Sequence, residues 1–459
     1  MFNTGIGKVV DKTSNISLSL EPVMFNSIRK VLSDSAIIEA CRQADYDYRK
    51  RIITPIVTVL HMIIAAIWPE DSFVASWQLT WSSFAANHPC FWGQSPHGGS
   101  VVKARKRLPL QVWKNIVERL SQQAQENSES LAYWRSHRVV NADGTCLTVA
   151  DEPQLRKEFG ISKGNYGDRK YPLVRLVCLC LAETMTVIGY RLGGYRNDEN
   201  ALLAPMLKTL QDGDLLVADR HYAGSNLYWH YMQNGLEYLT RLHQKQVVSK
   251  LKQLWSYGQN DFVARLNITA VYRRRNPEMP KYIKARFIRV QAHSRGNQKP
   301  IWLVTSLLDA ERYPADEIAQ LYLKRWRIET LFGQFKVEGG ADLLRSKSGD
   351  GVRKEVAARI CAINIVRIIM LQAAEAGGVD VMRISFVGAV RAIIAFAPAL
   401  ALRPLWELPM IYEAMLMEIA SHLVPERPGR LEPRNITHDK RKYTRLKTTR
   451  TQWRKQYAA

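Results

Sequence analysis

The sequence predicts an α/β protein in which a mixed-sheet core with a β-rich insertion is flanked by helical N- and C-terminal regions. Residues 1–130 and 346–459 have mostly helical periodicity, whereas 131–345 contains β-rich runs separated by turn signals. In the middle region three successive strands are followed by alternating helix and strand, which is typical of a mixed sheet covered by helices. Two basic β-rich runs in 243–300 interrupt that order and predict an insertion.

The expected elements follow in chain order. In the N-terminal region helices are expected at 27–44, 55–68 and 110–125, with a Gly/Pro/Ser-rich loop at 87–100. The core strands are expected at 138–151, 171–183, 185–194, 214–219, 237–242 and 301–309, with helices at 197–210 and after 225. The insertion is expected to be an antiparallel pair formed by 261–275 and 281–293. A helix then begins near Pro314, a residue favoured in the first turn, and the chain is helical again after 350.

The charge balance of the 459-residue chain points to a polyanionic partner. It contains 65 Lys and Arg against 42 Asp and Glu, a net charge of +23. Such an excess creates a field that attracts nucleic acid first and an anionic membrane surface second. The length is sufficient for two or three domains with a sizeable core.

The cysteines favour a reducing compartment, so the cytoplasm is the expected location. They form no CxxC pair and no dense disulfide pattern, and they are Cys41, Cys90, Cys146, Cys178, Cys180 and Cys361. Cys178 and Cys180 share one face of a strand but lack nearby His ligands. They are therefore expected to be buried thiols rather than a zinc site.

No membrane partner is expected. The N-terminus lacks the apolar core of a signal peptide. The apolar run 54–69 is too short to span a bilayer, which takes about 20 apolar residues, and the run 385–402 is interrupted by Arg391 and Pro398. Both runs are expected to be core helices.

Two acidic residues lie on or at the end of predicted core strands. Asp143 is within the first strand, and Asp219 ends a short apolar strand and is followed by Arg220 and His221. The carboxyl end of a buried strand is a usual position for a catalytic or ligand-binding group in α/β sheets. The alternative is an ordinary turn residue, because Asp before Gly often begins a turn, as at Asp143.

The segment "YLKRWRIETLFGQFK" contains a row of polar side chains beside an apolar face. If it forms one continuous helix, four residues fall within about 60° of one another and span roughly 21 Å; they are Tyr322, Arg325, Glu329 and Lys336. The alternative is a helix edge with spaced salt bridges, since Arg325 and Glu329 form a good i, i+4 pair. That alternative leaves Tyr322 and Lys336 unexplained.

Three acids together with phosphate-binding groups suit phosphodiester chemistry. Breaking such a bond at neutral pH requires an activated oxygen nucleophile and a stabilised leaving oxygen. Two divalent ions about 3.5–4 Å apart supply both, and Mg²⁺ is held by carboxylates, waters and phosphates. Cations and a phenol beside the acids would then bind the DNA backbone.

The motif residues resemble those of a known family. The spacing of Tyr, Arg, Glu and Lys in "YLKRWRIETLFGQFK" is similar to the signature helix of bacterial insertion-sequence transposases of the IS-four family. "DGT" at 143 and "ADRHY" at 218 resemble the first and second acid motifs of that family, in the same order. The likeness covers residues 138–340 and extends to "CRQADYDYRKRIITP" near the N-terminus.

This resemblance implies an RNase H-like core and a DDE active site. The implied metal-binding and catalytic acids are Asp143, Asp219 and Glu329, with two Mg²⁺ ions and Mn²⁺ as a substitute. The implied DNA phosphate contacts are Tyr322, Arg325 and Lys336. Family members that form a DNA hairpin stack a flipped base on a tryptophan, and Trp302 stands at the corresponding place; the alternative is a buried strand aromatic. Arg220 and His221 are weaker candidates for DNA contact.

The resemblance also implies cut-and-paste transposition. The chain would bind terminal inverted repeats of double-stranded DNA, cleave the ends through a hairpin, and join the 3′ hydroxyls to target DNA as a homodimer on the nucleoid. Residues 1–130 would bind the DNA ends, 131–345 would be catalytic, and 346–459 would serve dimerisation or DNA contact. Two other functions stay open: a nuclease or resolvase of the same fold without strand transfer, and a non-catalytic DNA-binding protein derived from a transposase.

The basic C-terminal tail has two readings. Residues 427–455 carry 11 Lys and Arg against Glu432 and Asp439, with Tyr443 and Trp453 interleaved. This composition fits either a solvated chain end or a contact with nucleic acid.

Overall fold

The structure is a computed structural model. It describes residues 26–49, 51–67, 73–86, 93–127, 133–164, 167–243, 248–294, 297–338 and 343–425. Met1–Val290 and Pro300–Val424 form one compact unit, and Gln291–Lys299 with Pro425–Ala459 form a second. The site, core and pockets described below belong to the first unit. The basic tail 427–455 lies outside the described residues.

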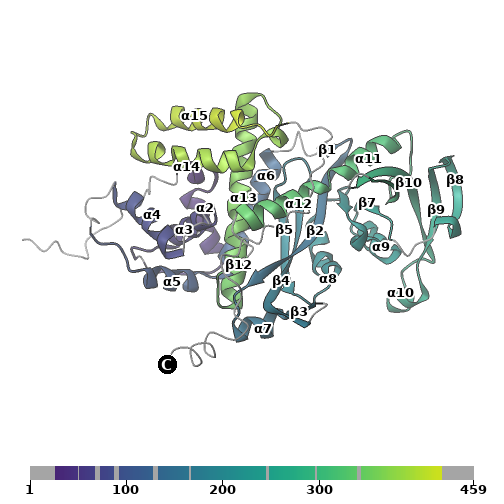
Figure 1. The fold of residues 1–459 in the computed structure, drawn as a ribbon, viewed down its shortest axis with the longest axis horizontal. Helices are drawn as coiled ribbons and strands as arrows, with labels where there is room; N and C mark the ends of the chain where they lie inside the picture. Colours follow the sequence, from purple (N-terminus) through teal and green to yellow (C-terminus); the bar gives the residue numbers. More distant parts are fainter. Residues whose placement is uncertain are drawn as a thin grey trace, which may run out of the picture. The chain divides into compact units, whose positions relative to one another are not determined.

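A five-stranded mixed sheet forms the centre of the first unit (Figure 1). Its order is β5-β4-β2-β6-β7, in which β5, β4 and β2 are antiparallel neighbours and β2, β6 and β7 are parallel neighbours. The strands are β2 (His137–Val149), β4 (Gly167–Leu181), β5 (Val187–Gly194), β6 (Leu215–Ala218) and β7 (Glu237–Arg241). Three antiparallel strands followed by two parallel ones make an RNase H-like core, so the predicted fold class is confirmed.

Shorter strands and the insertion extend this sheet. β3 (Ile161–Gly164) pairs with β4, while β1 (Tyr133–Trp134) and β12 (Leu343–Leu344) pair with β2. The insertion adds β8 (Lys252–Gly258), β9 (Asp261–Asn267), β10 (Tyr282–Ser294) and β11 (Asn297–Thr305). β9 and β10 are antiparallel, as predicted, and β11 joins the insertion to the core by pairing with β7.

One predicted strand of the insertion is too long. The run 261–275 was expected to be a single strand, but β9 ends at Asn267 and Ala270–Arg275 forms the short helix α10. Buried residues in β9 end with Leu266, and Ile268 is the last buried residue before the exposed helix. The residues that follow, Ala270–Arg275, have no buried position and form α10 instead of continuing the strand.

Helices cover the sheet and form the N- and C-terminal regions. Those before the sheet are α1 (Asn26–Val31), α2 (Asp34–Gln43), α3 (Pro55–Ile67), α4 (Phe73–Ala86), α5 (Gly98–Arg107) and α6 (Leu110–Asn127). Those within the sheet region are α7 (Pro153–Phe159), α8 (Glu199–Leu203), α9 (Ser225–Gln233), α11 (Ala315–Leu323) and α12 (Trp326–Gly333). Those after it are α13 (Gly349–Gly377), α14 (Phe386–Leu402) and α15 (Leu408–Ser421).

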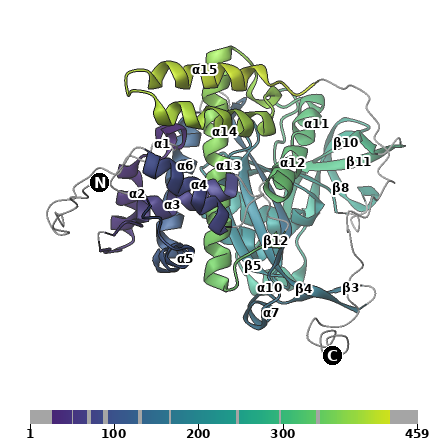
Figure 2. The ribbon, with the colours of Figure 1, turned by 60° about the vertical axis from the view of Figure 1, so that its left-hand side comes forward.

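Helix α13 is the central packing element. It contacts α3, α6, α14 and α15 on one side and β5 on the other (Figure 2). Asn364 on α13 fixes its position on the sheet, because its Oδ1 accepts from Val187 N at 2.9 Å and its Nδ2 donates to Val187 O at 2.8 Å. One hydrophobic core therefore runs from the N-terminal helices through α13 to one face of the sheet.

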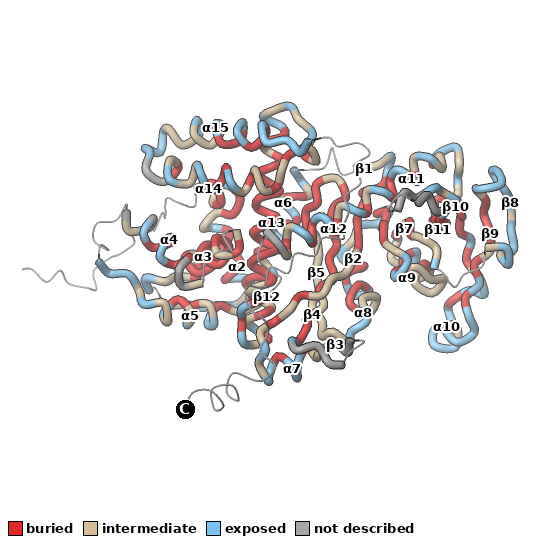
Figure 3. Tube along the Cα trace, viewed as in Figure 1, coloured by how far each residue is buried: buried red, intermediate tan, exposed pale blue. Residues whose placement is uncertain are grey.

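Burial accounts for the long apolar segments. By length and composition α13 could cross a membrane, yet its most apolar window is 94% buried inside the protein (Figure 3). The two shorter apolar runs form the helices α3 and α14; α3 is buried at most positions, as predicted, whereas the described part of α14 is mostly half-buried or exposed. Cys178 and Cys180 are buried free thiols, as expected, and burial raises the pKa of Cys180 to about 12.

The prediction of one continuous helix from Tyr322 to Lys336 is wrong. α11 ends at Leu323, Lys324 and Arg325 form a tight turn, and α12 begins at Trp326. In that turn the backbone N–H groups of Lys324 and Arg325 bond to carbonyls three residues earlier, at 3.0 and 3.1 Å. After Gly333 the helix becomes a π-helical turn, Gln334–Glu338.

The break has a tertiary cause. Glu183, in the turn between β4 and β5, accepts from Lys324 Nζ at 2.6 Å and from Arg327 Nη1 at 2.7 Å. Asn141 Nδ2 on β2 donates to the Lys324 carbonyl at 3.4 Å. These contacts fix the junction on the sheet. The angles predicted for the four side chains on one continuous helix therefore do not apply beyond Leu323.

Candidate active site

Asp143 and Asp219 lie on neighbouring strands at the same level. β2 and β6 are parallel, with Ala142 opposite Ala218, and each acid directly follows its alanine. The charge of Asp219 acts on Asp143, so the two carboxylates lie near each other. Adjacent strands are about 4.8 Å apart, which brings two carboxylates to one place at the carboxyl end of β6. The sequence predicted that Asp143 and Asp219 share one site, and the strands that carry them are neighbours in the fold.

Backbone N–H groups orient both carboxylates. Gly144 N donates to Asp143 Oδ1 at 2.8 Å, and His221 N donates to Asp219 Oδ1 at 2.7 Å. Asp219 thereby caps the 3₁₀ turn Arg220–Tyr222 that follows β6. Each acid keeps one oxygen free of these backbone contacts.

The protonation of Asp143 is strongly influenced by its surroundings. Its pKa is raised from the ordinary 3.8 to about 6: burial is the largest cause and the nearby charges of Asp219 and Glu199 add to it, while Gly144 N–H and the Arg325 guanidinium oppose the rise. A raised carboxyl pKa in an acid cluster is common at functional sites. In this geometry a cation would strongly favour the ionised form of Asp143.

Arg325 links the third acid to the first. Its Nη1 lies 3.8 Å from Asp143 Oδ2, and its Nη2 donates to Glu329 Oε1 at 3.2 Å. The Arg325 side chain is 8% exposed, whereas that of Glu329 is 44% exposed. The salt bridge between Arg325 and Glu329, expected if this segment were an ordinary helix edge, is thus present. The same guanidinium also reaches Asp143 on β2.

Tyr322 completes this group from the last turn of α11. Its ring centroid lies 5.8 Å from the Arg325 guanidinium carbon, and its side chain is buried. Burial raises the pKa of the Tyr322 phenol, Arg325 lowers it, and Asp219 raises it. Despite the helix break, Tyr322, Arg325 and Glu329 therefore reach the neighbourhood of the two strand acids.

The remaining predicted site residues lie further from this group or at its surface. Lys336 is half-buried in the π-helical turn and forms no ion pair within the described part of the chain. Trp302 is partly buried on β11, edge-on to Phe262 with ring centroids 5.6 Å apart. Arg220 and His221 are exposed, and the His221 ring lies 3.3 Å from Asp198 rather than against Asp219.

A fourth acid, Glu199, was missed by the sequence reasoning. It accepts from Tyr222 Oη at 2.9 Å and from Arg175 Nη1 at 3.1 Å, and its carboxyl group fills the space beside Gly144. A Cβ at position 144 would lie 2.5 Å from that carboxyl group. In the sequence Glu199 resembles an ordinary acidic residue in the first turn of a helix, so no local signal distinguishes it.

The donor set suits a hard divalent cation. Carboxylate oxygens are the ligands Mg²⁺ prefers, and Asp143 and Asp219 place two of them side by side. Glu329 is on the other side of the Arg325 guanidinium, and among the described residues no three His, Cys, Asp or Glu side chains come close enough to hold one ion. The residues present fit a metal ion that is held first by Asp143 and Asp219. Glu329 would have to move toward the two aspartates to become a third ligand.

Comparisons with known proteins find similar sequences for a large part of the chain. A family model described as "Transposase DDE domain" matches residues 134–365, just over half of the chain, and includes all three acids. Transposase InsG for insertion sequence element IS4 of Escherichia coli K12 is 24% identical over 280 residues, which are 60% of this chain and 62% of that protein. InsZ of the same strain is 23% identical over 199 residues, covering 40% of this chain and 65% of InsZ.

One solved structure is also similar. The piggyBac transposase synaptic complex with hairpin DNA aligns over 88% of this chain and 86% of the piggyBac chain, at 12% identity and a TM-score of 0.43. The chain spans less than two thirds of the length of the two E. coli relatives. On the family match and these relatives, the chain belongs to the DDE transposases of the IS-four family.

Proposed function

We propose that this chain is an insertion-sequence transposase that cuts and joins DNA ends. It binds the terminal inverted repeats of double-stranded DNA, cleaves at the element ends, and joins the 3′ hydroxyls to target DNA. The observation that carries the proposal is the placement of Asp143 and Asp219 directly after the paired residues Ala142 and Ala218 of two parallel strands, with Arg325 between Asp143 and Glu329. Membership of the family supports the same chemistry.

The three acids act as metal ligands in this proposal. Two Mg²⁺ ions, or Mn²⁺ in their place, would supply an activated water and a stabilised leaving oxygen when bound. Asp143 must be ionised to serve as a ligand, so its proton leaves as the site is loaded. Glu329 is the most exposed of the motif acids, which leaves its carboxylate able to turn toward the two aspartates.

Cationic and aromatic side chains hold the DNA in the proposal. Arg325 and Tyr322 lie beside the acids, where they would contact the phosphate to be cut. Lys336, on the π-helical turn, would contact a phosphate further along the backbone. Trp302 would stack a flipped base if cleavage passes through a hairpin, and the exposed Arg220 and His221 would contact DNA beside the second acid.

The rest of the chain is assigned by the same reasoning. Residues 1–130 bind the DNA ends, 131–345 carry out catalysis with 243–300 as a basic insertion, and 346–459 serve dimerisation or DNA contact. The working form is a homodimer that pairs two ends on the nucleoid in the bacterial cytoplasm. The net charge of +23 supports a role on DNA.

A strand-transfer assay tests the proposal against its two alternatives. The full chain is incubated with end-containing duplex DNA, supercoiled target DNA and Mg²⁺. Joined products together with cleaved ends are expected for a transposase. Cleavage without joining would indicate a nuclease or resolvase, and binding without cleavage would indicate a non-catalytic DNA-binding protein.

A further inference from the structure

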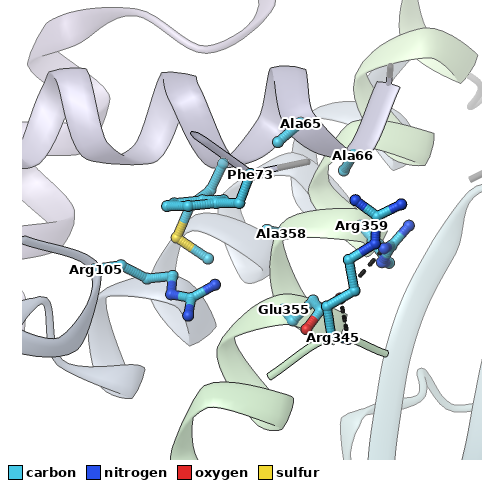
Figure 4. A pocket seen from close by; sticks show the side chains of 9 residues that line it. Ala65, Ala66, Phe73, Arg105, Arg345, Glu355, Ala358 and Arg359 are labelled. Atoms are coloured by element: carbon cyan, nitrogen blue, oxygen red, sulfur yellow. Dashed lines mark hydrogen bonds and ion pairs between the residues drawn. The ribbon is translucent and has the colours of Figure 1, made fainter. Parts of the chain in front are cut away.

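A small pocket with an unusual charge balance lies away from the acid site. It has a volume of about 50 Å³ and is bounded by α3, α4, α5 and α13 (Figure 4). Met62, Phe73 and three alanines form its apolar wall. Its charged lining consists of Arg105, Arg345, Arg359 and Glu355, three guanidinium groups and one carboxylate.

Arg359 is the most deeply buried of the three arginines. Its side chain is 7% exposed, and its Nη2 donates to Glu355 Oε1 at 3.2 Å. Its Nε and Nη1 atoms are buried and have no hydrogen-bond partner among the described residues. Leaving buried charged donors unpaired is costly, so the position favours a ligand that accepts from them.

Glu355 cannot neutralise all three arginines. Its oxygens accept from Arg345 N at 3.2 Å, from Ser346 N at 3.0 Å and from Ser346 Oγ at 2.7 Å, besides the Arg359 contact. These bonds use the carboxylate to fix the chain after β12. Among the charged residues that line the pocket, three guanidinium groups therefore stand against one carboxylate.

The other two arginines flank the buried one. Figure 4 shows Arg345 and Arg359 on one side of the pocket and Arg105 on the other, beneath Phe73. The Arg105 guanidinium carbon lies 4.6 Å from the centroid of the Phe73 ring, which positions it. Burial lowers the pKa of Arg359, Glu355 raises it, and the positive charge of Arg345 lowers it, as expected where two guanidinium groups are close together.

A second basic cavity lies on the other side of α5. It has a volume of about 340 Å³, and its lining includes Arg49, Arg51 and Arg107. Arg105 and Arg107 are two residues apart on α5 and line the two different cavities. A ligand that carries phosphates at regular intervals, such as a nucleic-acid backbone, suits two basic cavities on either side of one helix better than a single small anion does.

We propose that the pocket binds a phosphate group, with Arg359 at its buried end and Arg105 and Arg345 beside it, and that in the DNA complex this group is a backbone phosphate. Guanidinium groups match phosphate oxygens in geometry and charge. The assignment to DNA rests on the proposed function, whereas the phosphate site itself does not. The pocket anchors DNA at the junction of the N-terminal helices with α13, away from the acids that cut it.

Inorganic phosphate tests the site itself. Its binding to the full chain is measured by calorimetry at constant ionic strength. Arg359→Met and, as a less buried second variant, Arg105→Gln are each expected to weaken phosphate binding by about tenfold or more. The control is Arg353→Gln, which also removes one positive charge from α13. Native Arg353 pairs with Glu158 outside the pocket, so this variant should bind phosphate like the wild type.

DNA binding tests the source of the phosphate. With duplex DNA, Arg105→Gln should reduce the slope of log affinity against log salt by about 0.9, the value for one lost phosphate contact, and Arg353→Gln should not. If Arg105→Gln loses phosphate binding but keeps the wild-type slope of log affinity against log salt with DNA, the assignment of the phosphate to DNA would be overturned. Equal phosphate binding by the wild type and both pocket variants, or none by the wild type, would overturn the site. A wild type that binds phosphate but no DNA would instead refute the proposed function.

Discussion

The Arg325 guanidinium lies 3.8 Å from the Asp143 carboxylate, so a residue of the turn between α11 and α12 reaches directly to β2, the central strand of the sheet. The same guanidinium holds Glu329 at 3.2 Å. One buried cation thereby connects two acids that lie far apart in the sequence. For Glu329 to join the aspartates on a metal, Arg325 must give up part of this bridge, and an incoming DNA phosphate is a suitable new partner for it.

Asp143→Asn should stabilise the metal-free chain at neutral pH. The pKa of Asp143 is about 6 in the folded chain against an ordinary 3.8, so the folded state binds more protons than the unfolded state between these values. Folding stability therefore falls as pH rises through this window, and the loss is complete above it. Asp143→Asn cannot ionise at this position, so it avoids that loss in the free energy of unfolding, which is on the order of 2–3 kcal/mol.

Urea unfolding in chelator at several pH values checks this expectation. The difference between the variant and the wild type should be largest above about pH 7 and should shrink toward pH 4. Asp212→Asn, at an exposed carboxyl, should change stability by less than about 0.5 kcal/mol at every pH. A difference that is independent of pH would contradict the raised pKa of Asp143.

Glu183→Gln should loosen the junction between α11 and α12. It weakens two ion pairs that fix the turn, with Lys324 at 2.6 Å and Arg327 at 2.7 Å, and the Glu183 side chain is only 20% exposed. We expect a loss of about 1–3 kcal/mol in the free energy of unfolding. The control is Glu152→Gln, whose exposed pair with Lys347 spans 3.5 Å and should contribute under about 0.5 kcal/mol. Equal losses in the two variants would show that Glu183 does not fix the junction.

Lys336→Ala should weaken DNA-end binding with a shallower salt dependence. If Lys336 contacts one phosphate, the slope of log affinity against log salt should fall by about 0.9. Lys336→Arg keeps the charge and should keep the slope. Fluorescence anisotropy with end-containing duplexes measures both, and an unchanged slope in Lys336→Ala removes this residue from the phosphate contacts.

The sequence predicts the acid site better than it predicts the helix beside it. Asp143 and Asp219 could be placed because they occupy a strand and a strand end, and parallel pairing brings such positions together. The break after Leu323 could not be foreseen, because its main cause is Glu183, which lies 141 residues before Lys324 in the chain. Local helical periodicity contains no information about such a partner.

Glu199 illustrates a second limit of the sequence. Its place beside Gly144 depends on Tyr222 and Arg175, which come from two other elements of the fold. In the insertion, the apolar alternation continues to Tyr272, so the end of β9 at Asn267 does not follow from the pattern along the chain. Patterns along the chain therefore predict elements, while convergence of side chains from several elements requires the structure.

Glu329→Gln tests the central claim most directly. The variant should bind end-containing DNA as the wild type does, and its cleavage rate in Mg²⁺ should fall by more than about a hundredfold, since even partners of metal ligands contribute tenfold to a hundredfold. Glu317→Gln makes the same change in charge on α11, at an exposed pair with Arg135, and should cleave normally. Cleavage by Glu329→Gln at the wild-type rate would contradict the assignment of Asp143, Asp219 and Glu329 as the catalytic triad.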